Sequence, residues 1–181
     1  MRAAWCSLGS SQPVQFEVVH EFDIPLDALE LAVISPHLFH ELAKRLHSIE
    51  SVLQKEHVLT GTRLDRLWSY RANVKIPAFA TKYVTAEMCA WDERSTYEIA
   101  THSSEWTILP HIKPDWRKHF AAKGTYRLDG LTSGRTRRTV VGTVELRVPV
   151  VRQVAEKLIV GEVTKTFDAE AETLRDLATL V

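Results

Sequence analysis

The fold is decided by the stretch PVVRQVAEKLIVGEVTKTFDAEAETLRDLATLV, which runs from Pro149 to Val181. A proline suits the first turn of a helix because its missing N–H has no partner there, and no later proline interrupts the stretch. Apolar residues then recur at steps of three and four, namely Val151, Val154, Ala155, Leu158, Ile159, Val163, Phe167, Ala171, Leu174, Ala178 and Val181. The pattern predicts one long C-terminal helix that needs a broad apolar surface to lie on.

The apolar face of this predicted helix changes direction near Gly161. At about 100° per residue, the apolar centre of residues 151–159 lies roughly a third of a turn from that of residues 163–181. Either a kink or a winding of the helix around a curved sheet accounts for the change. Glu162 and Lys165 then point to a cavity mouth or to water, and we favour water because long charged side chains usually reach solvent.

A strand and two short helices are predicted near the start of the chain. Apolar and polar residues alternate over 14–22, which indicates a half-buried strand with His20 on its inward side. Asp27 is a suitable cap for a helix that ends near residue 35, and Pro36 permits a second helix to about residue 47.

Alternation and turn residues predict further strands at residues 49–59, 64–74, 84–91, 96–102, 120–129 and 140–148. The register of 49–59 changes face, which favours a bulge, and Arg66 interrupts the apolar side of 64–74. We interpret residues 92–94 as a tight hairpin loop, residues 77–80 as an irregular insert, and residues 103–118 as a strand end with a Trp-rich loop. The arginines at 135, 137 and 138 lie beside a predicted hairpin tip, where charge is usually solvated.

Composition bounds the class of protein. A chain of 181 residues with 45% hydrophobic and 25% charged residues suits one domain, which we place at 14–181 after a loose tail at 1–13. The 23 basic and 23 acidic residues balance, so nucleic acid is not an expected partner. Two cysteines make no disulfide framework, and no run approaches the roughly 20 apolar residues of a membrane span. We therefore expect a cytoplasmic protein without an integral membrane segment.

The order of elements resembles the START-like superfamily, also called SRPBCC, helix-grip or Bet v-like. Val18-Val19-His20-Glu21-Phe22-Asp23-Ile24-Pro25 looks like its first strand entering the first helix, and residues 142–149 followed by Glu156 and Leu158 look like its last strand entering the C-terminal helix. Pro77-Ala78-Phe79 is similar to an uncharacterised bacterial branch, which often has glycine near the position of Arg152. The resemblance implies an α+β fold, in which a curved antiparallel sheet of about seven strands surrounds the long helix.

The same resemblance implies an elongated apolar cavity between sheet and helix, and a small hydrophobic or lipid-like ligand that is carried or sensed. Small residues at Gly124, Gly142 and Gly161 mark where space could remain, although close approach of helix and sheet explains glycines equally well. The residues that we expect to line such a site are His20, Trp68, Tyr70, Met88, Tyr97, Ile99, Trp106, Tyr126, Gly142, Leu158 and Gly161.

Catalysis has little support in the sequence. No nucleophile elbow, phosphate loop or dinucleotide fingerprint is present, and the histidines lack metal-ligand spacing, so we predict no catalytic residue, no metal and no cofactor. One alternative is a cyclase or dehydratase that acts on an aromatic or polyketide-like substrate, with His20 beside Tyr70 or Tyr126. Another is a protein- or membrane-interaction module that uses the loop from Trp106 to Trp116. The sequence leaves the oligomeric state open.

Overall fold

The computed structural model describes residues 13–73, 89–112, 114–132, 134–147 and 152–179. Seven antiparallel strands in these residues form one sheet with the order β1-β7-β6-β5-β4-β3-β2. The strands are β1 (Val14–Phe22), β2 (Ile49–Thr60), β3 (Arg63–Ala72), β4 (Ala90–Glu98), β5 (Ser103–Pro110), β6 (Phe120–Leu131) and β7 (Arg135–Leu146). The helices are α1 (Leu26–Ile34), α2 (His37–Ala43), α3 (Pro114–Arg117) and α4 (Arg152–Ala178), with a 3₁₀ turn at Ile99–Thr101.

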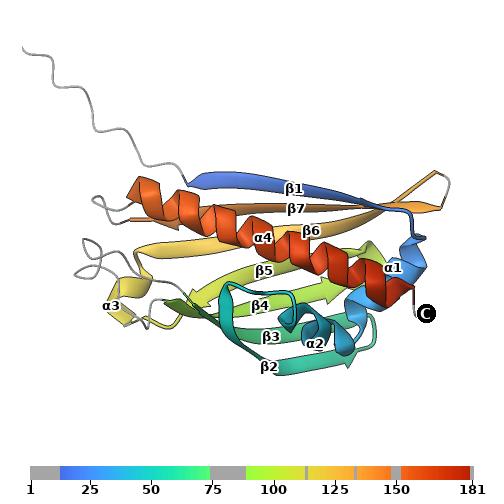
Figure 1. Ribbon diagram of the computed structural model, residues 1–181, viewed down its shortest axis with the longest axis horizontal. Coiled ribbons are helices and arrows are strands. Elements are labelled where there is room, and N and C mark those ends of the chain that lie inside the picture. Colours follow the sequence, from blue (N-terminus) through green and yellow to red (C-terminus); the bar gives the residue numbers. More distant parts are fainter. Residues whose placement is uncertain (1–12, 74–88, 113, 133, 148–151, 180–181) are drawn as a thin grey trace, which may run out of the picture.

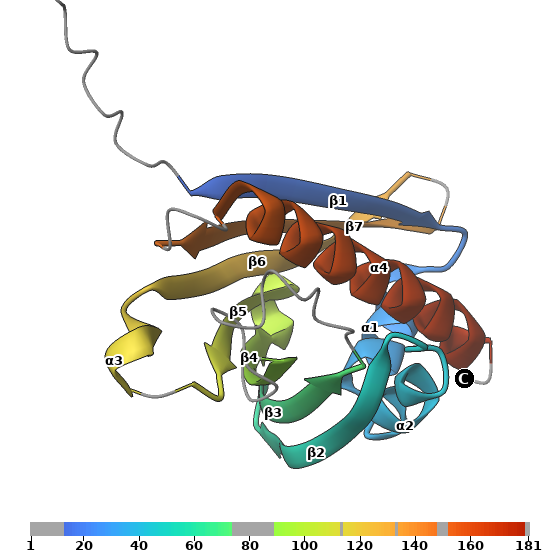
Figure 2. The same cartoon turned by 60° about the vertical axis from the view of Figure 1, so that its left-hand side comes forward.

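The long helix α4 lies across the concave side of the curved sheet (Figures 1 and 2). It packs mainly on α1, α2, β7 and β1, while its contacts with the central strands β3, β4 and β5 are sparse. Leu29 of α1, Leu38 of α2 and Leu174 of α4 are fully buried and form the core at this end. The predicted α+β helix-grip fold is therefore confirmed, and α4 is supported much more by one half of the sheet than by the other.

The register of the strands agrees with the predicted alternation in β1 and β2. Phe16, Val18 and Phe22 of β1 are buried and face the helix, as expected for a half-buried strand. The pairing of β2 with β3 shifts between Ile49 and Ser51 and again between Gln54 and Glu56. These shifts confirm the predicted bulge, which follows from the change of apolar face along that segment.

The predicted hairpin loop at residues 92–94 is wrong, because β4 runs straight through it. Asp92 accepts a bond from Lys55 Nζ of β2 at 2.8 Å and contacts His111 Nε2, just after β5, at 2.8 Å, so its charge is used in contacts across the sheet. The chain turns at residues 99–102 instead, where His102 takes a left-handed backbone conformation with φ of 50°. A charged triplet without glycine or asparagine was thus a poor turn signal.

Two helix boundaries also differ from the prediction. Pro25, rather than Asp27, occupies the N-cap position of α1 and makes no side-chain capping bond, and the Asp27 carboxylate accepts a bond from the N–H of Ala28 inside the first turn. The second helix ends at Ala43 rather than near residue 47. The C-terminal helix is continuous through Gly161, while residues 149–151 and 180–181, the predicted insert at 77–80 and nearly all of the N-terminal tail lie outside the described residues. No helix within the described ranges is long and apolar enough to cross a membrane.

Candidate functional site

Register places four side chains on the inward side of β3 and β4, and we call them the Trp68–Glu93 face. Trp68 lies opposite Glu93, and Tyr70 lies opposite Trp91 one step further along the same side. Directly paired residues project to the same face of a sheet, so all four point to the helix side. The rings of Tyr70 and Trp91 stack with centroids 5.3 Å apart, and Trp68 packs on Phe39 of α2 at 5.5 Å.

The structure brings five of the eleven predicted ligand residues together in the sheet–helix interior. Trp68, Tyr70, Tyr97, Trp106 and Tyr126 are all buried on the inward side of four adjacent strands, β3 to β6. The others are placed differently. Ile99 is half-buried in the 3₁₀ turn, Gly161 is exposed, His20 and Gly142 lie nearer the opposite edge on β1 and β7, and the side chains of Met88 and Leu158 lie outside the description.

The space expected over the inward glycines is filled by an aromatic ring. A Cβ added at Gly142 would lie 2.4 Å from the Phe16 ring and 2.7 Å from the Trp106 ring, and one at Gly124 would lie 2.4 Å from Trp106. These glycines therefore let the Trp106 side chain lie close against β6 and β7. They leave no open volume for a ligand at that place. Gly161 has no described atom within 4 Å of an added Cβ, so close packing does not explain it.

Trp106 also contradicts the interaction-loop alternative. It lies inside β5, is 5% exposed, and its ring centroid is 6.1 Å from that of Phe16 and 6.0 Å from that of Phe167 on α4. A buried core residue cannot contact a partner or a membrane without unfolding, so Trp106 is removed from that hypothesis.

Buried hydrogen-bonding groups without partners distinguish this interior. Among the described residues, Trp68 Nε1 and Trp106 Nε1 have no hydrogen-bond partner. Further unpaired atoms are Gln54 Oε1 and His57 Nδ1 on β2 and Arg138 Nε on β7. A buried polar group left without a bond costs about 1–3 kcal/mol, so several together are unusual in a folded interior. Water or a polar part of a ligand is the ordinary way to satisfy such groups.

Glu93 is the residue that the sequence interpretation missed. It is half-buried, faces inward between Trp68 and Ile108, and forms no hydrogen bond or ion pair with any described residue. Burial, reinforced by the negative charge of Glu170 and opposed by Arg66, raises the pKa of Glu93 to about 7. Glu93 can therefore hold or release a proton near neutral pH. Its place in a supposed turn hid it from pattern analysis.

Arg66 is a cation close enough to act on this face, but it is engaged elsewhere. Its Nε donates to Ser95 Oγ at 3.2 Å, and its guanidinium carbon lies 4.9 Å from the centre of the Trp68 ring. The side chain is 8% exposed and shares the inward side of β3, where the sequence interpretation saw an interruption. It forms no ion pair with Glu93 in the part of the chain that the structure describes.

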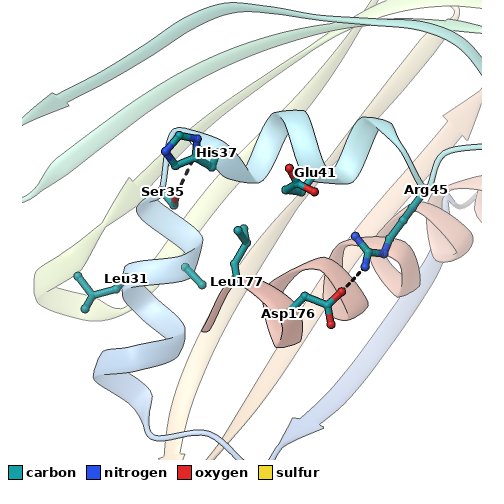
Figure 3. A pocket seen from close by; sticks show the side chains of 8 residues that line it. Leu31, Ser35, His37, Glu41, Arg45, Asp176 and Leu177 are labelled. Carbon is teal, nitrogen blue, oxygen red and sulfur yellow. Dashed lines mark hydrogen bonds and ion pairs between the residues drawn. The ribbon is translucent and has the colours of Figure 1, made fainter. Parts of the chain in front are cut away.

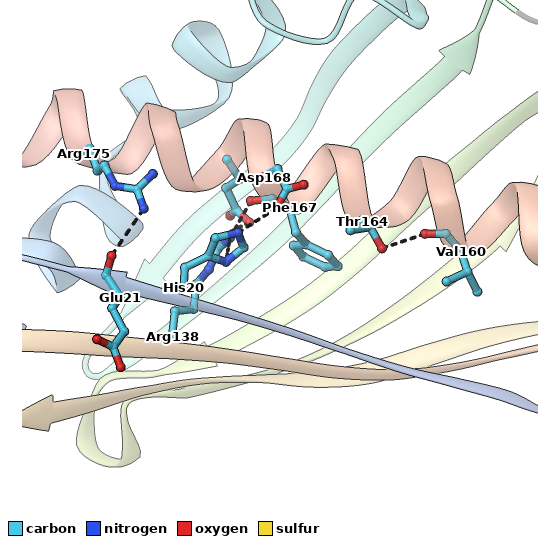
Figure 4. Close-up of polar contacts among 9 residues, drawn as sticks. His20, Glu21, Arg138, Val160, Thr164, Phe167, Asp168 and Arg175 are labelled. Carbon is cyan, nitrogen blue, oxygen red and sulfur yellow. Dashed lines mark hydrogen bonds and ion pairs between the residues drawn. The ribbon is translucent and has the colours of Figure 1, made fainter.

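A second polar group, the Arg138 cluster, comprises His20, Arg138, Asp168 and Glu170 and joins β1, β7 and α4. Figure 4 shows His20, Arg138 and Asp168 beneath the helix. Arg138 is fully buried, and it donates to Glu170 Oε2 at 2.9 Å and to the carbonyl oxygen of Phe167 at 2.5 Å. The terminal nitrogen that bonds the Phe167 carbonyl also donates to His20 Nδ1 at 3.1 Å, and His20 Nε2 bonds Asp168 Oδ1 at 2.8 Å. The expectation that this arginine is solvated at a hairpin tip is wrong, because β7 already begins at Arg135.

The bonding of His20 fixes its proton. Since an arginine can only donate, Nδ1 must accept and the proton of the neutral ring lies on Nε2, facing Asp168. Burial, and then the charge of Arg138, lower the pKa of His20, which favours this neutral form. Both ring nitrogens are thus occupied and neither is available to Tyr70 or Tyr126, which weakens the pairing required by the cyclase alternative.

The three interior tyrosines do not supply an ionised nucleophile. Burial raises the pKa of Tyr70, Tyr97 and Tyr126. The Tyr97 hydroxyl donates to Glu30 Oε1 at 2.7 Å, which ties α1 to the sheet, and His102 Nδ1 contacts the same oxygen at 2.8 Å. No three His, Cys, Asp or Glu side chains gather as metal ligands would in the described part of the chain.

A surface groove of about 380 Å³ lies apart from this interior, between α1, α2 and the end of α4 (Figure 3). Leu31, Ala32 and Leu177 form its apolar part, and the ion pair of Arg45 with Asp176 lies at its rim. None of the predicted ligand residues lines it.

Solved structures with the same architecture define the class. Norcoclaurine synthase from Thalictrum flavum superposes with a TM-score of 0.62 at 11% identity, covering 99% of this chain and 98% of that one. Zhui aromatase/cyclase from Streptomyces sp. R1128 gives 0.62 at 13% identity, covering 93% and 94%. A protein from Thermus thermophilus gives 0.61 at 14% identity, covering 92% and 98%. At such low identities they establish the START-like helix-grip fold.

Sequence comparison then gives the family. The model for the family described as protein of unknown function (DUF2505) matches residues 17–177, so the chain belongs to that family. No curated protein matches the sequence.

Proposed function

We propose that this protein binds a small hydrophobic molecule between the concave side of the sheet and α4. The observation that carries the proposal is the pair of buried donors on that side without a described partner, Trp68 Nε1 and Trp106 Nε1. Apolar surroundings with a few convergent polar groups are typical of small-molecule sites. A ligand that accepts hydrogen bonds there would remove the cost of leaving these groups unbonded.

The uneven support of α4 agrees with this proposal. The helix packs on β1 and β7 but has few contacts with β3, β4 and β5, where the Trp68–Glu93 face lies. Ile108 and Glu93 face inward there and yet are only half-buried. Inward side chains stay partly accessible when space is left between the sheet and the helix, as a ligand site there would require.

The structural neighbours support a small-molecule role without naming the ligand. One is a synthase and another an aromatase/cyclase, so this fold accommodates small organic molecules in proteins of very different sequence. Fold-level likeness is an analogy, and the residues of this chain must supply the specificity.

A blocking substitution tests the proposal. Titration with N-phenylnaphthylamine, a neutral probe that fluoresces in apolar surroundings, should show saturable binding to the full chain. Ile108→Trp adds a large ring on the inward side of β5, and we expect it to weaken probe binding by about tenfold or more.

Leu109→Trp is the matched control, since Leu109 is the next residue, is 47% exposed and faces away from the helix. It should leave probe affinity unchanged, and circular dichroism should show both variants folded. Absence of saturable binding to the parent chain, or equal affinity in the two variants, would contradict the proposal.

A cyclase-type activity is a second candidate because Glu93 can exchange a proton near neutral pH and lies beside Tyr70 and Trp91. The test is turnover of an aromatic polyketide-like substrate, with loss of at least about a hundredfold in Glu93→Gln. Unchanged turnover in that variant would exclude Glu93 as the acid or base.

A further inference from the structure

We infer that the ligand carries a basic nitrogen next to its apolar or aromatic part, and that Glu93 is the residue that binds this nitrogen on the Trp68–Glu93 face. The inference rests on the proposed function, since it names the class of ligand for the same interior site.

The first step concerns the missing partner. Glu93 points inward from the central strand β4, yet no described side chain or backbone N–H bonds its carboxyl group. Inward carboxylates are normally paired, because an isolated charge in an apolar interior is strongly disfavoured. The cation that acts on it, Arg66, is bound to Ser95 and stacked over Trp68. The described part of the chain therefore places a carboxyl group inside without supplying a bonded counter-charge.

The second step concerns the surroundings. Trp68 lies directly across from Glu93, and the stacked rings of Tyr70 and Trp91 lie one step along the same side. Aromatic faces attract cations, and the attraction increases when the cation is removed from water. Trp68 Nε1 also has no partner among the described residues. The face thus contains a second buried group that a bound molecule could satisfy. A carboxylate beside several rings favours an ammonium group attached to an apolar body.

The third step concerns charge. Glu170 of α4 adds a negative charge that acts on Glu93, whereas Arg66 and Tyr70 of β3 and the apolar Ile108 of β5 are its other neighbours. Glu170 is itself bonded to Arg138. A cationic ligand would separate Glu93 from this second carboxylate, while an anionic ligand would add to the repulsion.

Three probes with one ring system test the inference by isothermal titration calorimetry. Naphthylethylamine, naphthylethanol and naphthylacetate differ only in the group at the end. At pH 8 we expect the parent chain to bind the amine about tenfold more tightly than the alcohol, and the carboxylate more weakly than either. Glu93→Gln should reduce the ratio of amine to alcohol affinity to about one. Glu105→Gln, on the exposed side of β5, should leave it unchanged.

Proton release gives a second measurement that needs no variant. At pH 7 Glu93 is about half protonated, so binding of an ammonium group should release up to about half a proton per probe. Titrations in buffers with different ionisation enthalpies measure this release. The neutral alcohol should release none, and amine affinity should increase from pH 6 to pH 8.

The outcomes separate the two proposals. If the alcohol and the amine bind equally well and neither releases a proton, the basic-nitrogen inference is wrong while the hydrophobic site stands. Retention of the amine preference in Glu93→Gln would also overturn the inference. If none of the three probes binds, both the site and the inference fail.

Discussion

The Arg138 cluster and the Trp68–Glu93 face are both buried polar regions beneath α4, but they are built in opposite ways. In the first, both terminal nitrogens of Arg138 are bonded, to Glu170, His20 and the Phe167 carbonyl, and its Nε alone has no partner among the described residues. In the second, Glu93 and Trp68 Nε1 have no bonding partner among the described residues. Paired interior charges fix the position of a helix, whereas unpaired ones leave free energy available for binding another molecule. One sheet thus carries a region that holds the helix and a region suited to a ligand.

The largest expected effect comes from breaking the paired region. Arg138→Met leaves the buried Glu170 carboxylate without its cation, and we expect a loss of about 3–5 kcal/mol in the free energy of unfolding. Denaturant titration measures it. Arg137→Met, the adjacent exposed partner of Glu21, should cost no more than about 1 kcal/mol.

A double variant checks the reason for that loss. In Arg138→Met with Glu170→Met neither member of the buried pair is left alone, so much of the stability should return. A double variant as unstable as the single one would mean that packing, and not pairing, holds this region.

The next largest effect, expected for Glu93→Gln, is a gain in stability. The folded state raises the pKa of Glu93 from 4.5 to about 7, so it disfavours the charged form, and stability is lost as pH rises through this window. Glu93→Gln removes that loss. The variant should be more stable than the parent by up to about 3 kcal/mol at pH 8, with little difference at pH 4. Equal stability at pH 8 would show that Glu93 has an unrecognised partner.

The smallest effects come from one substitution made at two glycines. Gly142→Ala should cost about 1–2 kcal/mol, because the new methyl group meets the ring ends of Phe16 and Trp106, which must shift. Gly161→Ala meets no described atom within 4 Å and should gain up to about 1 kcal/mol of helix stability. Thermal unfolding should therefore show a lower midpoint for Gly142→Ala and a higher one for Gly161→Ala than for the parent chain. A gain at Gly142 would show room beside Trp106 after all.

Much of the fold could be predicted because it depends on periodicity. Alternation placed Trp68, Tyr70 and Tyr126 on the inward side of their strands, and the three- and four-residue spacing marked α4. The positions of the turns were harder to predict. Asp92 is charged because it bonds Lys55 and His111 across the sheet, and not because it lies in a loop.

The charged part of the site could not be predicted in this way. Pattern analysis assigns charged residues to the wet side of a strand, and Arg66, Glu93 and Arg138 all face inward. Their burial depends on partners far away in the sequence, such as Glu170 on α4 for Arg138. Only the assembled sheet and helix show that Arg138 is paired with a carboxylate, whereas Arg66 and Glu93 form no ion pair with a described residue.

The strand order has a consequence for how the chain is made and folded. β1 precedes the other described strands in the chain, yet its neighbour in the sheet is β7, with Val14 opposite Val144. β2 to β5 form a meander in which each strand pairs with the next one in sequence, so they can assemble while the ribosome is still making β7. β1 closes a very long loop and must wait unpaired with its apolar side uncovered. Folding of this domain is thus expected to end with the pairing of its first described strand.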